Sequence, residues 1–210
     1  MSRRFRRRWR RWAAPLAAPR YVAGAQANLL SCLNVERAHI LGAAAGGLTA
    51  TGFAVAHPDR TRSLILAGTI FSLDEGDWRE FYGRLGIAAV RDTVSTAFIE
   101  LGPAYRLTNP DGAKRFAKLS EASKPAALPR QKRGIDVTWR ALKQMTTPTL
   151  LVTGEADLYA PPPLQAKVAE HLANHRLKTI PAVGHAAYWE EPETFNAIVL
   201  DYLNSLAATK

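Results

Sequence analysis

Short apolar runs that alternate with longer helical patterns organise this chain. Four runs rich in Leu, Ile, Val and Thr end at or near a glycine or proline, which predicts buried strands at 38–42, 62–68, 147–154 and 176–181. Apolar residues at helical spacing predict helices around them, at 20–34, 44–58, 161–173 and 192–206. Strands that alternate with helices favour a parallel sheet with right-handed crossovers, so we expect an α/β protein.

Residues 72–146 break this alternation. They carry aromatic residues among charged ones and are interrupted by "GP", "NPDG" and "KPAALP". Such interruptions favour several short helical segments over strands. We therefore expect a helical insertion at 72–146 and a core made of 20–71 and 147–210.

Composition sets broad limits on the class of protein. The 210 residues are enough for one domain with a sizeable core, and 47% hydrophobic with 22% charged residues fits a globular protein. No apolar run is long enough to span a bilayer. The single cysteine, Cys32, excludes an intramolecular disulfide and a cysteine-based zinc site. We expect no metal and no cofactor, and a cytoplasmic protein.

The positive charge of the chain is concentrated near the N-terminus. Eight arginines and no acidic residue in residues 1–35 account for +8 of the net charge of +10, which leaves the rest near neutral. We interpret 1–19 as a solvated, disordered tail, because like charges repel and the segment cannot build a core. Arginines between aromatic residues could instead contact nucleic acid or an anionic membrane. "SRRF" before a short apolar stretch also loosely resembles a twin-arginine export signal.

Candidate chemistry gathers in three loops that follow predicted strands. The stretch "HILGAAAGG" (39–47) is an apolar run that leads into a glycine-flanked turn. "GEADLYAPP" places Asp157 just after strand 147–154, and "VGHAAYWEEP" places His185 just after strand 176–181. Open α/β sheets carry their sites at the carboxyl ends of the strands, so we expect these loops to meet. A carboxylate that holds one histidine nitrogen leaves the other nitrogen as a base.

Taken together, these segments resemble the alpha/beta-hydrolase superfamily, in the branch of enol-lactonases, meta-cleavage-product hydrolases and small esterases. "LLSCLNVERAHILGAAAGGLTATGFAVAHPDRTRSLILAGT" is similar to the elbow region of that family. "PTLLVTGEADLYAPP" and "PAVGHAAYWEEPETFN" are similar to its acid and histidine segments, in the same order. The resemblance covers 20–71 and 147–206 and places 72–146 where the family has its cap. It implies the C-terminal portion of that fold, with about four parallel strands, flanking helices and a helical cap insertion.

The resemblance implies a role for particular residues. Asp157 would be the triad acid, His185 the base, and the Ala45 backbone N–H half of the oxyanion hole. The nucleophile elbow G-x-S-x-G reads "GAAAG" at 42–46, so Ala44 stands in the nucleophile's place. Alanine has no hydroxyl and cannot form an acyl-enzyme. The residue types alone also allow a helix-capping carboxylate at Asp157 and a turn histidine at His185.

Aromatic and acidic residues near these loops are weaker candidates. Trp78, Tyr188 and Trp189 could bind substrate, although an aromatic pair beside a closing helix is more often part of a core. Glu190 and Glu191 precede Pro192, where negative charge suits a helix N-terminus.

The resemblance further implies four strands before the elbow strand and an "HG" loop that supplies the second oxyanion donor. Only about 35 residues precede the elbow strand here, which is too few for four strands with their turns. We therefore expect a chain that starts part-way through its fold. The strand at 38–42 would then have an open edge, which favours self-association.

The sequence leaves several functions open. We favour a degenerate or weakly active relative of hydrolases that act on small ester, lactone or C–C substrates, because Ala44 replaces the nucleophile and the oxyanion loop is expected to be missing. One alternative is an active hydrolase or a non-hydrolytic enzyme that uses the His185–Asp157 pair as general base on a small-molecule substrate. Another is a non-catalytic binding protein, since fold alone does not choose between these functions.

Overall fold

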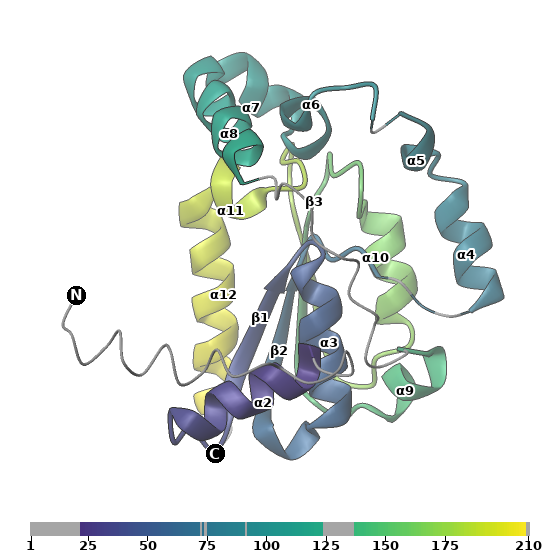
Figure 1. Cartoon of the computed structure of the whole chain (residues 1–210), viewed down its shortest axis with the longest axis vertical. Helices are drawn as coiled ribbons and strands as arrows, with labels where there is room; N and C mark the ends of the chain where they lie inside the picture. The colour runs from purple at the N-terminus through teal and green to yellow at the C-terminus, as the bar shows by residue number, and fades with distance from the viewer. Residues whose placement is uncertain (1–21, 72, 74, 91, 124–136, 209–210) are drawn as a thin grey trace.

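The computed structural model describes residues 22–71, 73, 75–90, 92–123 and 137–208 (Figure 1). The predicted Arg-rich tail at 1–19 lies outside the described residues. The expected α/β fold with a parallel sheet of four strands is confirmed. The strands are β1 (Ala38–Ala43), β2 (Thr61–Ala67), β3 (Thr149–Gly154) and β4 (His175–Ile180), hydrogen-bonded in the order β1-β2-β3-β4.

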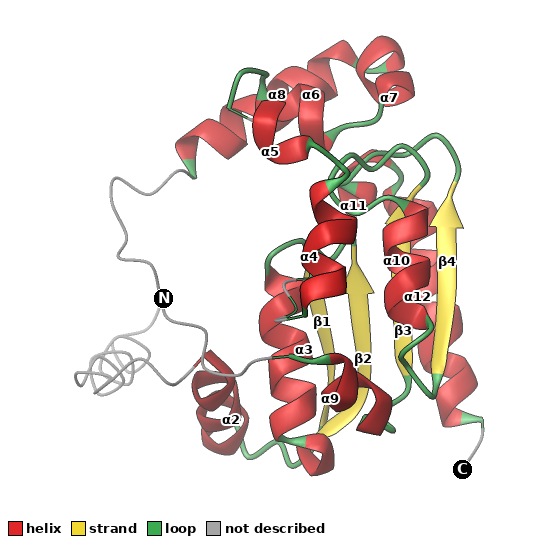
Figure 2. Ribbon diagram, turned by 90° about the vertical axis from the view of Figure 1, so that its right-hand side faces the viewer, coloured by secondary structure: helices red, strands yellow, loops and turns green. Residues whose placement is uncertain are grey.

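The strands are parallel and in register, so that the carboxyl ends of all four lie at the same end of the sheet. Ala67 at the end of β2 is opposite Ala43 of β1 and Val152 of β3, and Gly154 is opposite Ile180 of β4. The loops that follow the strands therefore leave the sheet at the same end, which is at the top in Figure 2.

Helices cover both faces of the sheet. Figure 1 shows α3 (Gly46–Ala56) and α10 (Pro162–Ala169) on one face and α12 (Pro192–Ala207) on the other. Successive side chains along a strand point to opposite faces of the sheet, so β2 contributes side chains to the core on both faces. Leu64 and Leu66 pack in the core cluster with α3 and α10, whereas Ile65 packs in the cluster with α12. All three leucine and isoleucine side chains are at most 2% exposed.

The segment between β2 and β3 is helical, as its composition predicts. Its described helices are α4 (Gly76–Gly83), α5 (Ile87–Val90), α6 (Thr96–Glu100), α7 (Pro103–Thr108), α8 (Pro110–Ala122) and α9 (Trp139–Gln144). Helices α4 and α9 contribute Trp78 and Leu142 to the core cluster of the α3 face. Helices α6, α7 and α8 instead pack together above the strand tips, near α11 (Ala187–Glu190) (Figures 1 and 2). The domain limits of 72–146 stay a prediction.

Some helices end at other residues than the sequence predicts, and two short helices were not predicted. The predicted helix 161–173 is realised as α10, which ends at Ala169. Beyond it, the His171 and Leu172 N–H groups bond to carbonyls three residues back, which tightens the last turn. The short helices η1 (Pro58–Arg60) and α11 were not predicted, because they are too short to carry a hydrophobic period.

The first helix of the described residues, α2 (Val22–Cys32), packs against α3 (Figure 1). Its predicted apolar stripe is only partly used, since Leu29 is 51% exposed and the following Leu33 is 60% exposed. Of the helices in the described ranges, none combines the length and apolar character that a membrane crossing needs.

Candidate active site

The acid and the histidine singled out in the sequence are in contact. Asp157 follows β3 and His185 follows β4, and these strands are neighbours in the sheet. The Nδ1 atom of His185 lies 2.9 Å from each carboxylate oxygen of Asp157. Asp157 is 2% exposed and His185 6% exposed, so the pair is shielded from water.

Backbone hydrogen bonds orient the Asp157 carboxylate. Its Oδ1 atom accepts the N–H groups of Tyr159 at 2.8 Å and Ala160 at 2.9 Å. The Tyr159 ring lies beside the His185 ring, with the centroids 4.9 Å apart. A carboxylate in its ionised form only accepts hydrogen bonds; in the tautomer of His185 that donates from Nδ1 to it, the Nε2 atom of the neutral ring is the acceptor.

Glycine at the end of β2 makes room for this pair. Gly68 has φ +52°, and a methyl group there would lie 3.1 Å from His185 Nδ1 and 3.2 Å from Asp157 Oδ2. Just before it, the Ala67 carbonyl accepts the N–H of Ala44 at 2.9 Å, which anchors the turn after β1 next to the pair. Sequence reasoning missed Gly68, although a glycine directly after a buried strand is a signal for close approach.

The turn after β1 has the form of an elbow. Ala44 has φ +48°, in the left-handed region that costs energy for any residue with a Cβ. Ala45 returns to helical angles and caps α3, so the chain passes from strand to helix in one sharp turn. A methyl group at Gly42 would lie 2.6 Å from the Gly46 carbonyl oxygen, so glycine allows α3 to approach β1 closely. Within the described ranges, no acceptor takes the Ala45 N–H.

The three aromatic candidates lie in different surroundings. Trp78 is 2% exposed, and its Nε1 donates to the Phe71 carbonyl at 3.3 Å within the core cluster, so the structure does not bring it to His185. Trp189 packs edge-on against Phe116 with the centroids 5.4 Å apart. Tyr188 is 44% exposed, and partial burial raises the pKa of its hydroxyl. A substrate-binding role for these side chains stays a prediction.

Two carboxylates near the histidine loop were missed or misjudged from the sequence. The sequence predicts Glu190 as a charge at a helix N-terminus, whereas the residue that caps α12 is Glu191. The Glu190 carboxylate is instead buried and accepts the N–H groups of Gly102 and Gly184, both at 3.0 Å. Half-buried Glu100 has a raised pKa, mainly through burial, and interacts electrostatically with His185 and Asp157.

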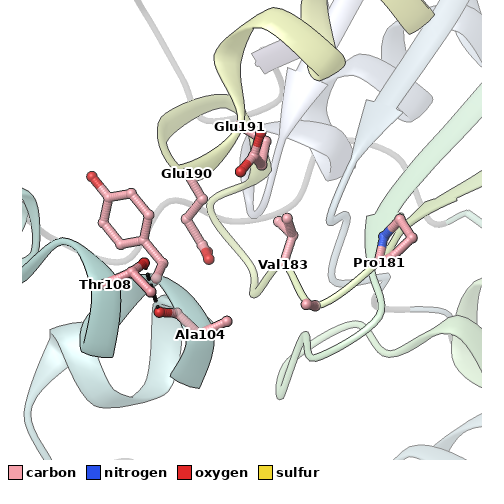
Figure 3. Close-up of a pocket in the computed structure, with 8 residues that line it drawn as sticks. Ala104, Thr108, Pro181, Val183, Glu190 and Glu191 are labelled. Atoms are coloured by element: carbon pink, nitrogen blue, oxygen red, sulfur yellow. Dashed lines mark hydrogen bonds between the residues drawn. The ribbon is translucent and has the colours of Figure 1, made fainter.

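A small cavity lies beside the histidine loop. Its volume is about 100 Å³, and Figure 3 shows Ala104 and Thr108 on one side and Pro181 and Val183 on the other. Neither Asp157 nor His185 lines it, so it is not the space above the pair. In the part of the chain that the structure describes, no three His, Cys, Asp or Glu side chains come close enough to hold a metal ion.

These features define an α/β protein with a strained elbow and a buried acid–histidine pair at the carboxyl ends of a parallel sheet. The model of the alpha/beta hydrolase fold family matches residues 17–192 of the chain. The match covers most of the sequence, so the chain belongs to the alpha/beta hydrolase family.

Known members of this family differ in substrate. The 2-hydroxy-6-oxononadienedioate/2-hydroxy-6-oxononatrienedioate hydrolase of Comamonas testosteroni is 27% identical over 84% of this chain and 66% of its own length. The pimeloyl-acyl-carrier-protein methyl ester esterase of Neisseria meningitidis is 27% identical over 92% of this chain and 79% of its own length. A solved hydrolase from Pseudomonas aeruginosa PA01 superposes with a TM-score of 0.66 at 26% identity, over 86% of this chain and 70% of its own. The chain thus spans about two thirds to four fifths of the length of these relatives.

Proposed function

We propose that this chain is a hydrolase relative that has lost nucleophilic catalysis and keeps a site for a small carbonyl compound. The observation that carries the proposal is Ala44, which occupies the strained elbow position with φ +48° beside an intact Asp157–His185 pair. The methyl ester esterase and the 2-hydroxy-6-oxononadienedioate/2-hydroxy-6-oxononatrienedioate hydrolase among the relatives suggest a small ester, lactone or diketone as the ligand.

Chemistry at Ala44 limits what the site can do. A methyl side chain has no oxygen with which to attack a carbonyl, so no acyl-enzyme forms. The Ala45 N–H lacks a protein acceptor among the described residues, which leaves it available to a ligand oxygen. The site is therefore suited to bind a carbonyl compound without cleaving it.

A second candidate function follows from the acid–histidine pair itself. Burying a carboxylate beside a histidine costs desolvation, and apolar side chains of similar volume often stabilise a core as well or better. A contribution to stability therefore does not by itself explain why this pair is buried here. A general base at His185 Nε2, acting on a water or on an acidic C–H of the ligand, would give it a use without a serine.

Esterase activity of the purified chain is expected to be at background. In a serine protease, loss of the nucleophile costs on the order of 10⁶-fold in kcat. Hydrolysis of a series of p-nitrophenyl esters measures this directly. The Ala44→Ser variant is expected to stay near background unless a second oxyanion donor is present, because the resemblance implies that donor on a loop ahead of the elbow strand.

The His185→Ala variant serves as the control for this measurement. A rate that survives in His185→Ala does not depend on the Asp157–His185 pair. A substantial rate in the unmodified chain that disappears in His185→Ala would contradict the loss of catalysis and favour the general-base function.

We further propose that two copies of the chain associate through the edge of β1 that pairs with no strand among the described residues. Among the described residues, β1 pairs only with β2, and Leu41 of this apolar strand is 50% exposed. At the other edge, β4 carries exposed Arg176 and Lys178, which protect against strand addition. The two edges therefore differ in their tendency to pair.

Sedimentation at two salt concentrations is expected to reveal this association. Screening of the tail charges at high salt should raise the dimer fraction at tens of micromolar protein. Leu41→Lys should lower it, because a charge on an edge strand opposes pairing. A monomer at both salt concentrations would show that β1 is covered in solution.

A further inference from the structure

The loop that carries His185 is held from two sides. On one side, the Ala182 N–H donates to the exposed Glu155 side chain at 3.0 Å. On the other side, the Gly184 N–H donates to the buried carboxylate of Glu190, at 3.0 Å to Oε1 and 3.2 Å to Oε2. Ala182 itself has φ +60°, a conformation that persists only where the surroundings impose it.

The same Glu190 carboxylate reaches a segment that is distant in sequence. Its Oε2 atom accepts the N–H of Gly102, 88 residues earlier, at the junction between α6 and α7. Figure 3 shows the Glu190 side chain projecting between the helical segment of Ala104 and the loop of Val183. One carboxylate thus joins the helical insertion to the histidine loop.

The backbones of the two segments approach each other closely at this junction. A methyl group at Gly184 would overlap the Gly102 nitrogen, and one at Gly102 would lie 2.6 Å from the Ala182 carbonyl oxygen. The residue after His185, Ala186, donates its N–H to the Glu100 carbonyl at 3.0 Å and is fully buried. The residues on both sides of His185 are therefore fixed to the 100–102 segment.

We propose that Glu190 is a positioning residue, whose buried carboxylate sets the orientation of His185 by tying its loop to the α6–α7 junction. Both oxygens are used, and both donors are backbone N–H groups that would otherwise be buried without a partner. The inference rests on the proposed function only in taking His185 as the group that meets the ligand. Its tests do not use activity.

Amide hydrogen exchange and NMR of the ¹⁵N-labelled full chain test this role. In Glu190→Ala, the amides of Gly102 and Gly184 should exchange at least about tenfold faster, since each loses a hydrogen bond to a charged group. The imidazole signals of His185 should shift in the same variant. Signals of the four other histidines should stay in place, which separates a role in positioning from a general loss of structure.

The neighbouring glutamate provides a matched control. Glu191 is exposed, and Glu191→Ala should change neither the two glycine amides nor the His185 signals. Equal behaviour of Glu190→Ala and Glu191→Ala would overturn the proposal.

The conservative variant Glu190→Gln covers the case in which Glu190→Ala does not fold. Glutamine keeps one oxygen and turns the other acceptor into a donor, so at least one of the two glycine amides should lose protection. Unchanged exchange at both Gly102 and Gly184 in a folded Glu190→Gln would overturn the proposal. If neither variant folds, amide hydrogen exchange of the unmodified chain tests the proposal. Strong protection of the Gly102 and Gly184 amides would support the proposal, and fast exchange at both amides would overturn it.

Discussion

Gly154→Ala is expected to lower the free energy of unfolding by about 3 kcal/mol, because the new methyl group would overlap two backbone carbonyls. Gly154 is the last residue of β3, and its Cα faces the carbonyl oxygens of Val183 and Gly184 in the histidine loop. Both oxygens belong to the backbone and not to a flexible side chain, so β3 or the histidine loop must shift to accommodate the methyl group. Urea unfolding of the variant and the unmodified chain measures the loss.

The matched control for this substitution is Gly46→Ala. A methyl group at Gly46, the first residue of α3, meets nothing within 4 Å. The free energy of unfolding of Gly46→Ala should equal that of the unmodified chain or exceed it by about 0.5 kcal/mol, because alanine reduces the entropy of the unfolded chain. Equal stability of Gly154→Ala and Gly46→Ala would show that β3 and the histidine loop are not packed as described.

Asp157→Ala is expected to cost about 3 kcal/mol as well, for an electrostatic reason. The substitution leaves His185 Nδ1 and the N–H groups of Tyr159 and Ala160 without their acceptor in a buried site. Denaturant unfolding gives the change in stability, and NMR of the His185 ring reports the change in its tautomer.

Asp157→Asn separates the contributions of shape and charge. An asparagine oxygen can still accept the Tyr159 and Ala160 N–H groups, but its NH₂ group faces Nδ1 of His185. We expect a smaller loss of stability than in Asp157→Ala, with the His185 proton moved to Nε2. If Asp157→Ala unfolds at the same urea concentration as the unmodified chain, the carboxylate is not an essential acceptor.

The proposed function rests on two features of the site. Ala44 has no side-chain oxygen at the turn after β1, and the Asp157–His185 contact lies close to Gly68 at the carboxyl ends of the strands. A binding site for a carbonyl compound and a general base both fit these residues. The ester measurements and the His185→Ala control distinguish between them.

Local patterns in the sequence determined the order and type of the main elements. Apolar runs with glycine after them became strands β1 to β4, and helical spacing ending before Pro58 or beginning at Pro192 became α3 and α12. The positions of Asp157 and His185 after neighbouring strands also followed from the pattern, because parallel strands place their carboxyl ends together. These features depend on residues close in sequence, which is why periodicity and turn residues reveal them.

Tertiary structure alone decided which residues meet across long separations. Trp78 went into the core, Gly68 came beneath the acid–histidine pair, and Glu190 bonded to Gly102 on the insertion. A glutamate before a proline looks the same in sequence whether it is solvated or buried. Its partner N–H lies 88 residues away, so only the folded chain brings the two together and fixes the charge in the interior.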